Sequence, residues 1–149
     1  MRIADSNLAD LIEDIHVSEY GNYYFFDDFI ISEINEGVLY NWAAAQDAIE
    51  AAYKHYGENP SICYITNRVN NYSVKPLDWI KFFSSKNKLN GYAIVSYTER
   101  GWVNAVVEKL FLKTRVERFF DLYDAISWAK KVNSSIKNTE ENNAANKEK

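Results

Sequence analysis

An unusually polar connection, TNRVNNYSVKP at residues 66–76, contains the side chains best suited to recognising a ligand. It combines three amides with an arginine, a lysine, a tyrosine and a serine, and it separates a short apolar run from an amphipathic one. Ligands of open α/β sheets bind beyond the carboxyl ends of the strands, and a helix N-terminus at that position favours anions. The sequence therefore predicts a binding site, for a protein partner or a small ligand, made of Asn67, Arg68, Asn70, Asn71, Tyr72, Ser73 and Lys75.

The same stretch also has a purely structural interpretation. Ser73, or the residue just before Pro76, can cap the following helix, and the amides can satisfy backbone groups of the loop. Proline is well tolerated in the first turn of a helix because its missing N–H needs no partner there. We therefore expect a helix that begins near Pro76 and that Ser73 helps to start.

Side chains arranged for catalysis are hard to find. Neither His16 nor His55 lies in the spacing of a metal or protease site, and the G-x-S-x-G, G-x-x-x-x-G-K and G-x-G-x-x-G motifs are absent. An enzyme would need Glu33 or Glu36 brought close to His16. The single cysteine, Cys63, can form neither an internal disulfide nor a thiolate metal site, and the surrounding SICYIT predicts a small core side chain. We expect no catalytic residue, no metal site and no cofactor.

The bulk composition sets broad limits. The 149 residues are enough for one domain, and 47% of them are apolar, which excludes a wholly disordered chain. A net charge of −4 gives no general attraction to nucleic acid. The N-terminal stretch lacks the apolar core of a signal peptide, and no run approaches the roughly 18 apolar residues of a membrane span. We expect a cytoplasmic protein without stable membrane insertion.

Hydrophobic periodicity and turn residues predict the order of the elements. Residues 11–35 read as an antiparallel meander of three short strands, and helices and strands alternate after it. A single domain covers residues 1–137, and residues 138–149 form a disordered polar tail. The predicted fold is α/β, with a mixed four- to six-stranded sheet and helices mainly on one face. The expected helices are residues 39–56, 76–85, 99–112 and 122–136, and the expected later strands are 61–66, 91–97 and 114–120. Asn41 could cap the first helix, which Gly57 ends, and Asp121 is expected to cap the last.

Two patterns of apolar residues, one in the helix at 99–112 and one in the meander, predict which side chains are buried. In the helix at 99–112, an apolar stripe at helical spacing is expected to face the core: Val103, Val106, Val107 and Leu110. The meander contains consecutive aromatic residues, which a strand must point to opposite faces. Either both faces are covered within the chain, for instance by the N-terminal decapeptide, or one is an exposed patch. We favour a homodimer through Tyr23, Tyr24, Phe25 and Phe26.

The C-terminal half resembles a known family. The segments YAIVSYTERGWVNAVVEKLF and RVERFFDLYDAISWA are similar to the SpoIIAA-like or STAS domains related to lipid-binding Sec14 domains, with matching positions at Glu108, Lys109, Phe111, Phe119, Asp121, Ala125 and Trp128. The resemblance extends over roughly residues 10–135. It implies a sheet with helices largely on one face. It also implies a phosphorylated serine at the start of the helix after the third core strand, where Ser73 stands, although the family's preceding aspartate and following glycine are missing.

These features together predict a noncatalytic protein-interaction or regulatory module of the SpoIIAA or STAS type. Its partner would be another protein or a second copy of the chain. The alternative is a binder of a small amphipathic or lipid-like ligand, held in a pocket between the helices and the sheet. The aromatic residues expected to line such a pocket are Tyr72, Trp79, Phe82, Phe83 and Trp102.

Overall fold

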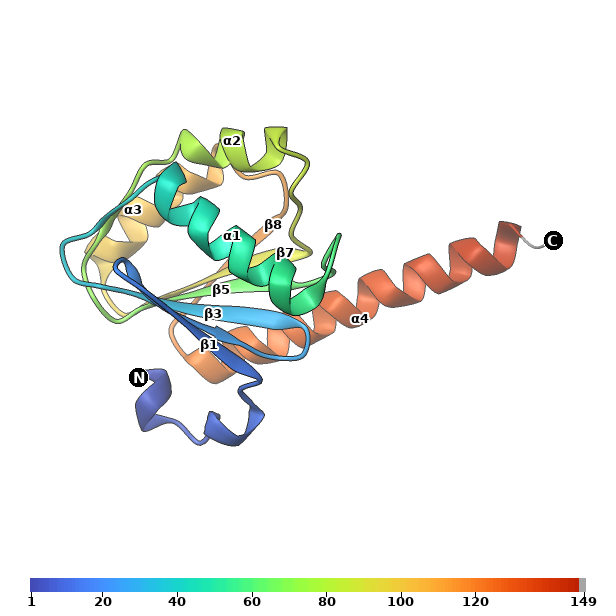
Figure 1. Ribbon diagram of the computed structural model, residues 1–149, viewed down its shortest axis with the longest axis horizontal. Helices are drawn as coiled ribbons and strands as arrows, with labels where there is room; N and C mark the ends of the chain where they lie inside the picture. Colours follow the sequence, from blue (N-terminus) through green and yellow to red (C-terminus); the bar gives the residue numbers. More distant parts are fainter. Residues whose placement is uncertain (148–149) are drawn as a thin grey trace.

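A six-stranded mixed sheet forms the centre of the computed structural model, which describes residues 1–147 (Figure 1). The strand order is β1-β2-β3-β5-β7-β8: the first three strands form the predicted antiparallel meander, and the others run parallel to β3. The prediction of an α/β fold with a mixed sheet is confirmed. The strands are β1 (Asp14–Ser18), β2 (Gly21–Phe25), β3 (Phe29–Ile34), β5 (Cys63–Arg68), β7 (Gly91–Ser96) and β8 (Arg115–Phe119).

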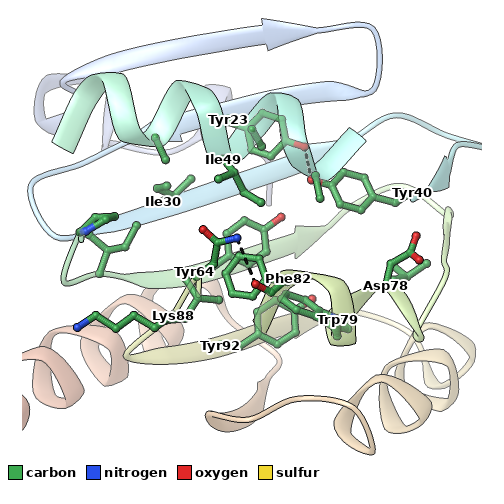
Figure 2. A pocket seen from close by; sticks show the side chains of 18 of the residues that line it. Tyr23, Ile30, Tyr40, Ile49, Tyr64, Asp78, Trp79, Phe82, Lys88 and Tyr92 are labelled. Carbon is green, nitrogen blue, oxygen red and sulfur yellow. Dashed lines mark hydrogen bonds between the residues drawn. The ribbon is translucent and has the colours of Figure 1, made fainter. Parts of the chain in front are cut away.

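Three helices share one face of the sheet: α1 (Trp42–Tyr56), α2 (Asp78–Ser84) and α3 (Glu99–Lys109). The first of them has the ends that its sequence predicts. The Asn41 side chain caps α1 by accepting a hydrogen bond from the Ala44 N–H, and the helix stops at Gly57, whose φ of 86° is unfavourable for other residues. This face of the sheet carries Tyr23, Ile30, Tyr64 and Tyr92, with α1 and α2 above them (Figure 2).

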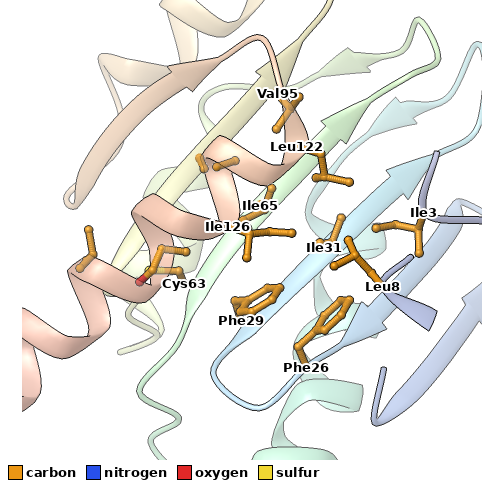
Figure 3. Packing of buried hydrophobic residues seen from close by; sticks show 14 residues of the cluster. Ile3, Leu8, Phe26, Phe29, Ile31, Cys63, Ile65, Val95, Leu122 and Ile126 are labelled. Atoms are coloured by element: carbon orange, nitrogen blue, oxygen red, sulfur yellow. The ribbon is translucent and has the colours of Figure 1, made fainter. Parts of the chain in front are cut away.

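The opposite face is covered by α4 (Leu122–Lys147) and by the N-terminal segment with its two short 3-10 turns, Ile3–Asp5 and Ala9–Leu11. Asp121 caps α4 as predicted, because its carboxylate accepts a hydrogen bond from the Tyr123 N–H. Ile3 and Leu8 of the N-terminal segment lie over Ile31 and Phe26, beside the apolar side chains of α4 (Figure 3). The sheet is therefore buried on both sides.

This covering overturns the predicted dimer surface. Tyr23 and Phe25 are buried beneath α1, and Phe26 is buried beneath the N-terminal segment, with Tyr24 half-buried beside it. The alternation of the strand does send these aromatics to opposite faces, as expected. Because the chain covers both faces itself, no aromatic patch is left on the meander for a partner.

The polar connection differs from its prediction in one respect. Ser73 and Val74 form a short strand, β6, that runs parallel to β4 (Leu39–Tyr40). The Ser73 N–H donates to the Val38 carbonyl, and α2 begins only at Asp78, after Leu77, which makes no side-chain cap. Ser73 is therefore not a helix cap: its backbone is used in strand pairing, five residues before the helix.

The apolar stripe of α3 also differs from its prediction. Val103 is 63% exposed and Leu110 79% exposed, and Val106 and Val107 are also exposed. Ala105 and Glu108 face the sheet instead, with Trp102 partly buried beside them. Counting apolar residues selected the wrong face, because the side of α3 that is buried contains a small residue and a carboxylate with buried partners.

The C-terminal end of α4 extends past the body of the molecule (Figure 1). Residues 138–147 were predicted to belong to a disordered polar tail, but they continue the helix, with exposed side chains at 138–146. Five of these ten residues are glutamate, alanine or lysine, which favour a helix, but the other five are asparagine or threonine, so intrinsic helix propensity does not account for the extension. The rest of that predicted tail, residues 148–149, lies outside the described residues.

Candidate functional site

A cavity of about 120 Å³ lies between α1, α2 and the sheet (Figure 2). It is smaller than the roughly 300–1,000 Å³ of pockets for drug-sized ligands, so it suits a smaller molecule. Most of its lining is apolar or aromatic. The side chains that define its walls are Tyr23, Phe25, Ile30, Ile34, Tyr40, Ala45, Ala48, Ile49, Ala52, Ile62, Tyr64, Tyr72, Trp79, Phe82, Leu89 and Tyr92.

The sequence creates this space by a mismatch of side-chain sizes. The wall contributed by α1 includes three alanines, Ala45, Ala48 and Ala52, which follow one another at helical spacing. The facing strands contribute large rings at alternate positions, among them Tyr64 and Tyr92, which stack at 5.4 Å. The short alanine side chains do not reach the rings, and the gap between them remains open.

The tyrosine hydroxyl groups around the cavity are hydrogen-bonded within the protein. Tyr23 and Tyr40 share a hydrogen bond of 2.5 Å between their hydroxyl oxygens. Tyr64 donates to Ser32 Oγ at 2.6 Å, and the Tyr72 hydroxyl shares a bond of 2.6 Å with Thr66 Oγ1. These bonds fix the ring orientations, so the cavity presents aromatic faces with a few polar edges.

A buried ion pair between Arg68 on β5 and Glu108 on α3 lies at the deep side of the cavity, where Glu108 forms part of the lining. Their side chains are only 6% and 1% exposed. Glu108 Oε2 accepts from Arg68 Nη2, while Oε1 accepts from the Trp79 indole N–H at 3.1 Å and from the Tyr92 hydroxyl at 3.3 Å. The carboxylate thus joins α2, α3 and two strands at one point.

The two ends of the cavity differ in charge. At one end, Asp78 Oδ2 accepts a hydrogen bond from the Trp42 N–H at 2.7 Å, which ties the start of α2 to the start of α1. At the other end, Tyr53 near the end of α1 donates to Asn87, just after α2, and Lys86 and Lys88 belong to the lining. Figure 2 shows Asp78 and Lys88 at opposite ends of the cavity.

Burial controls the ionisation of the aromatic hydroxyls. Loss of solvent raises the pKa of Tyr40, Tyr64 and Tyr92 well above the ordinary value of 10.0, and the neighbouring charge of Glu108 raises that of Tyr92 further. Burial also raises the pKa of Tyr23 and Tyr72, although Arg68 lowers the latter in part. These hydroxyls therefore act as neutral hydrogen-bonding groups at physiological pH.

No family model, no curated protein and no solved structure matches this chain. The resemblance to SpoIIAA-like domains consequently stays a prediction from the sequence.

Most of the predicted binding residues have internal partners. Asn67 is buried and donates to Glu33 and to the Met1 carbonyl, and Asn70 donates to the Ile34 carbonyl. Arg68 is held by Glu108, while the side chains of Asn71 and Ser73 lie on the surface. The structure brings two of the seven predicted residues, Tyr72 and Lys75, into the lining of the cavity.

Three of the five aromatic residues that were predicted to line a pocket do line the cavity. Tyr72, Trp79 and Phe82 line the cavity, whereas Phe83 and Trp102 pack behind it, with Phe83 against Phe82 at 5.0 Å. Five further tyrosines of the lining were not predicted: Tyr23, Tyr40, Tyr53, Tyr64 and Tyr92. Tyr64 and Tyr92 occupy equivalent positions in two adjacent parallel strands, and comparing these strands position by position would have paired them.

The pairing of Glu33 or Glu36 with His16 that an enzyme would need is absent from residues 1–147. The Nε2 atom of His16 pairs with Asp47 at 2.8 Å, while Glu33 accepts from the Ile3 N–H, so the carboxylate and the histidine do not form a catalytic pair. Cys63 is buried in the core as predicted, and burial raises its pKa to about 12. The described residues contain no cluster of three or more histidine, cysteine and acidic side chains able to hold a metal ion. Within the same residues, every helix is too short or too polar to cross a bilayer.

Proposed function

We propose that this chain is a noncatalytic domain that binds a small, largely apolar molecule in the cavity between α1, α2 and the sheet. The observation that carries the proposal is the aromatic lining opposite the alanines of α1. Protein interiors are usually close-packed, so an unfilled apolar space bounded by rigid rings is energetically unfavourable unless it is occupied. A guest with a single aromatic ring would restore the missing contacts by stacking on these side chains.

The polar groups around the cavity support binding rather than turnover. The tyrosine hydroxyls are paired with one another or with core side chains, and the Glu108 carboxylate accepts hydrogen bonds on both of its oxygens. Such groups orient a ligand. A general acid or base would need a free proton or lone pair within reach of the reacting atom.

A cavity-filling variant tests the proposal. Ala45→Phe places a ring in the space, whereas Ala43→Phe adds the same ring on the exposed side of α1, outside the lining. We expect thermal-shift and calorimetric titrations with small aromatic probes to detect binding to the wild type and to Ala43→Phe, and none to Ala45→Phe. A probe at a concentration of about 100 times its Kd should stabilise the fold by about 2.7 kcal/mol.

The matched controls decide the result. Undiminished binding to a folded Ala45→Phe variant would place the probe elsewhere. Absence of any stabilisation of the wild type by neutral, acidic and basic aromatic probes would remove the proposal altogether.

A second candidate is the protein-interaction role, now assigned to α3. Its exposed stripe of Val103, Val106, Val107 and Leu110 is apolar, continuous along the helix and without a cover within the described residues. A self-associating module would bury it against a second copy. Sedimentation of the wild type and of Val103→Glu/Val107→Glu would test this: a wild-type dimer that the variant abolishes supports it, and a wild-type monomer at high concentration contradicts it.

A further inference from the structure

We infer that the molecule bound in this cavity is an organic acid, with its anionic group at the end formed by Lys86 and Lys88. This inference rests on the proposed function and names the chemical class of the ligand. It depends on three observations about that end of the cavity: its two lysines, the absence of an ion pair to either of them among the described residues, and the carboxylate at the other end.

Both lysines are part of the lining and both are exposed, in the turn between α2 and β7. Lys86 has a φ of 64°, in the left-handed region that non-glycine residues rarely adopt, so the turn bends sharply there. Asn90 anchors the end of the turn, since its N–H donates to the Ile62 carbonyl at 2.8 Å. The Lys86 and Lys88 side chains thus extend from a turn whose backbone is held in place at the mouth of the cavity.

Within residues 1–147, neither ammonium group forms an ion pair with a carboxylate. Three other lysines have carboxylate partners: Lys54 with Glu50, Lys81 with Asp78 and Lys130 with Asp27. Among the residues that the structure describes, no carboxylate lies within 4.0 Å of Lys86 or Lys88. Two uncompensated positive charges at an apolar opening favour a ligand whose body is apolar and whose end is negative.

The other end of the cavity contains a carboxylate, Asp78. The backbone N–H of Trp42, which could have attracted an anion, already donates to the Asp78 carboxylate. That carboxylate also lies 3.4 Å from Lys81 Nζ. An anionic group would meet Asp78 at this end, with Lys75 as the one remaining lysine of the lining. The charge pattern therefore fixes the direction of the ligand, with its acidic group toward Lys86 and Lys88.

Three probes with the same single ring separate the acid from its neutral and basic counterparts: benzoate, benzyl alcohol and benzylammonium. Affinities are measured by calorimetry on the full chain in low salt. Because both lysines are exposed, each contributes modestly, and we expect the acid to bind about five- to tenfold more tightly than the alcohol. The amine should bind most weakly, and added salt should reduce the difference between the probes.

Substitution of selected lysines then shows which positive charges cause the preference for the acid. Lys86→Gln/Lys88→Gln should abolish the advantage of the acid, measured as the ratio of the affinities for the acid and the alcohol. Lys131→Gln/Lys137→Gln makes the same change in net charge on the exposed surface of α4, away from the cavity, and should preserve the advantage. Lys75→Gln, at the other end, should also preserve it.

The outcomes distinguish this inference from the proposed function. Equal binding of the three probes overturns the preference for acids and keeps the cavity as a binding site. An acid preference that survives Lys86→Gln/Lys88→Gln, or that is lost with Lys75→Gln, overturns the assigned direction. Failure of all three probes to bind overturns both proposals.

Discussion

Arg68 and Glu108 carry opposite charges into a part of the molecule from which water is almost excluded. Desolvation of two ions is unfavourable, and their attraction compensates for it only when the other hydrogen-bonding atoms are also satisfied. Glu108 meets this condition through Trp79 and Tyr92. Arg68 Nε makes no hydrogen bond, but the guanidinium group lies over the Tyr72 ring at 5.4 Å. The ion pair therefore fixes the relative positions of α2, α3 and two strands more than it adds to the free energy of unfolding.

We expect Glu108→Gln to lower the free energy of unfolding by about 3–5 kcal/mol, because it leaves the Arg68 charge buried without a counter-charge. Urea denaturation followed by circular dichroism would measure the loss. Glu117→Gln, an exposed change on β8, is the control and should have an effect within about 0.5 kcal/mol. The double variant Arg68→Met/Glu108→Leu should recover most of the stability, and a loss as large as that of Glu108→Gln would contradict this account.

Among the secondary-structure elements, α3 is bound to the domain by few of its own side chains. Its apolar stripe faces outward, and its attachment depends on Ala105, Trp102 and the Glu108 carboxylate. By contrast, α4 buries Leu122, Ala125, Ile126 and Ala129 against the sheet. The two helices look alike by hydrophobic pattern, yet α4 is a core element, whereas α3 is held by two apolar side chains and one carboxylate.

Substitution of a leucine in each helix should reveal this difference. Leu122→Ala on α4 should cost about 2–5 kcal/mol, because it removes a fully buried side chain. Leu110→Ala, at the end of α3, should change the free energy of unfolding by less than about 0.5 kcal/mol. Comparable losses in urea denaturation would mean that the stripe of α3 is buried in solution, by this chain or by a second copy.

At the scale of the whole molecule, the buried tyrosines tie stability to alkaline pH. In the unfolded chain they ionise near the ordinary pKa of 10.0, whereas burial raises the pKa of Tyr23, Tyr40, Tyr64 and Tyr92 in the folded state. Above pH 10 the unfolded state therefore binds fewer protons than the folded state, and stability falls as the pH rises. Below pH 10 these groups make no contribution to the pH dependence.

We expect cooperative unfolding in alkali, with each of these tyrosines lowering the free energy of unfolding by about 1.4 kcal/mol for every pH unit above 10. Absorbance at 295 nm and circular dichroism should change together. Tyr64→Phe removes one titrating group and should make the dependence less steep, whatever its effect at neutral pH. Full ionisation of the tyrosines near pH 10 with the fold retained would show that they are not buried.

The sequence predicted the meander, the alternation of helices and strands, and the caps at Asn41 and Asp121, because local patterns encode each of these. It failed where the decisive partner lies far along the chain. The buried face of α3 is set by Arg68, forty residues earlier in the sequence, and the cover over Phe26 comes from the N-terminal segment. The cavity itself arises from the difference in size between the alanines of α1 and the rings of three strands, which no single segment contains.

The pairing of β4 with β6 has a consequence for how a guest would enter and leave. The Lys75 N–H donates to the Tyr40 carbonyl, and the Ser73 N–H donates to the Val38 carbonyl. These backbone hydrogen bonds hold together the two segments that lead into α1 and α2. At the basic end, the same two walls are linked by side chains, through Tyr53 and Asn87. A motion that widens the cavity should therefore pivot about the paired strands β4 and β6. The contact between Tyr53 and Asn87 should then govern the residence time of the bound molecule.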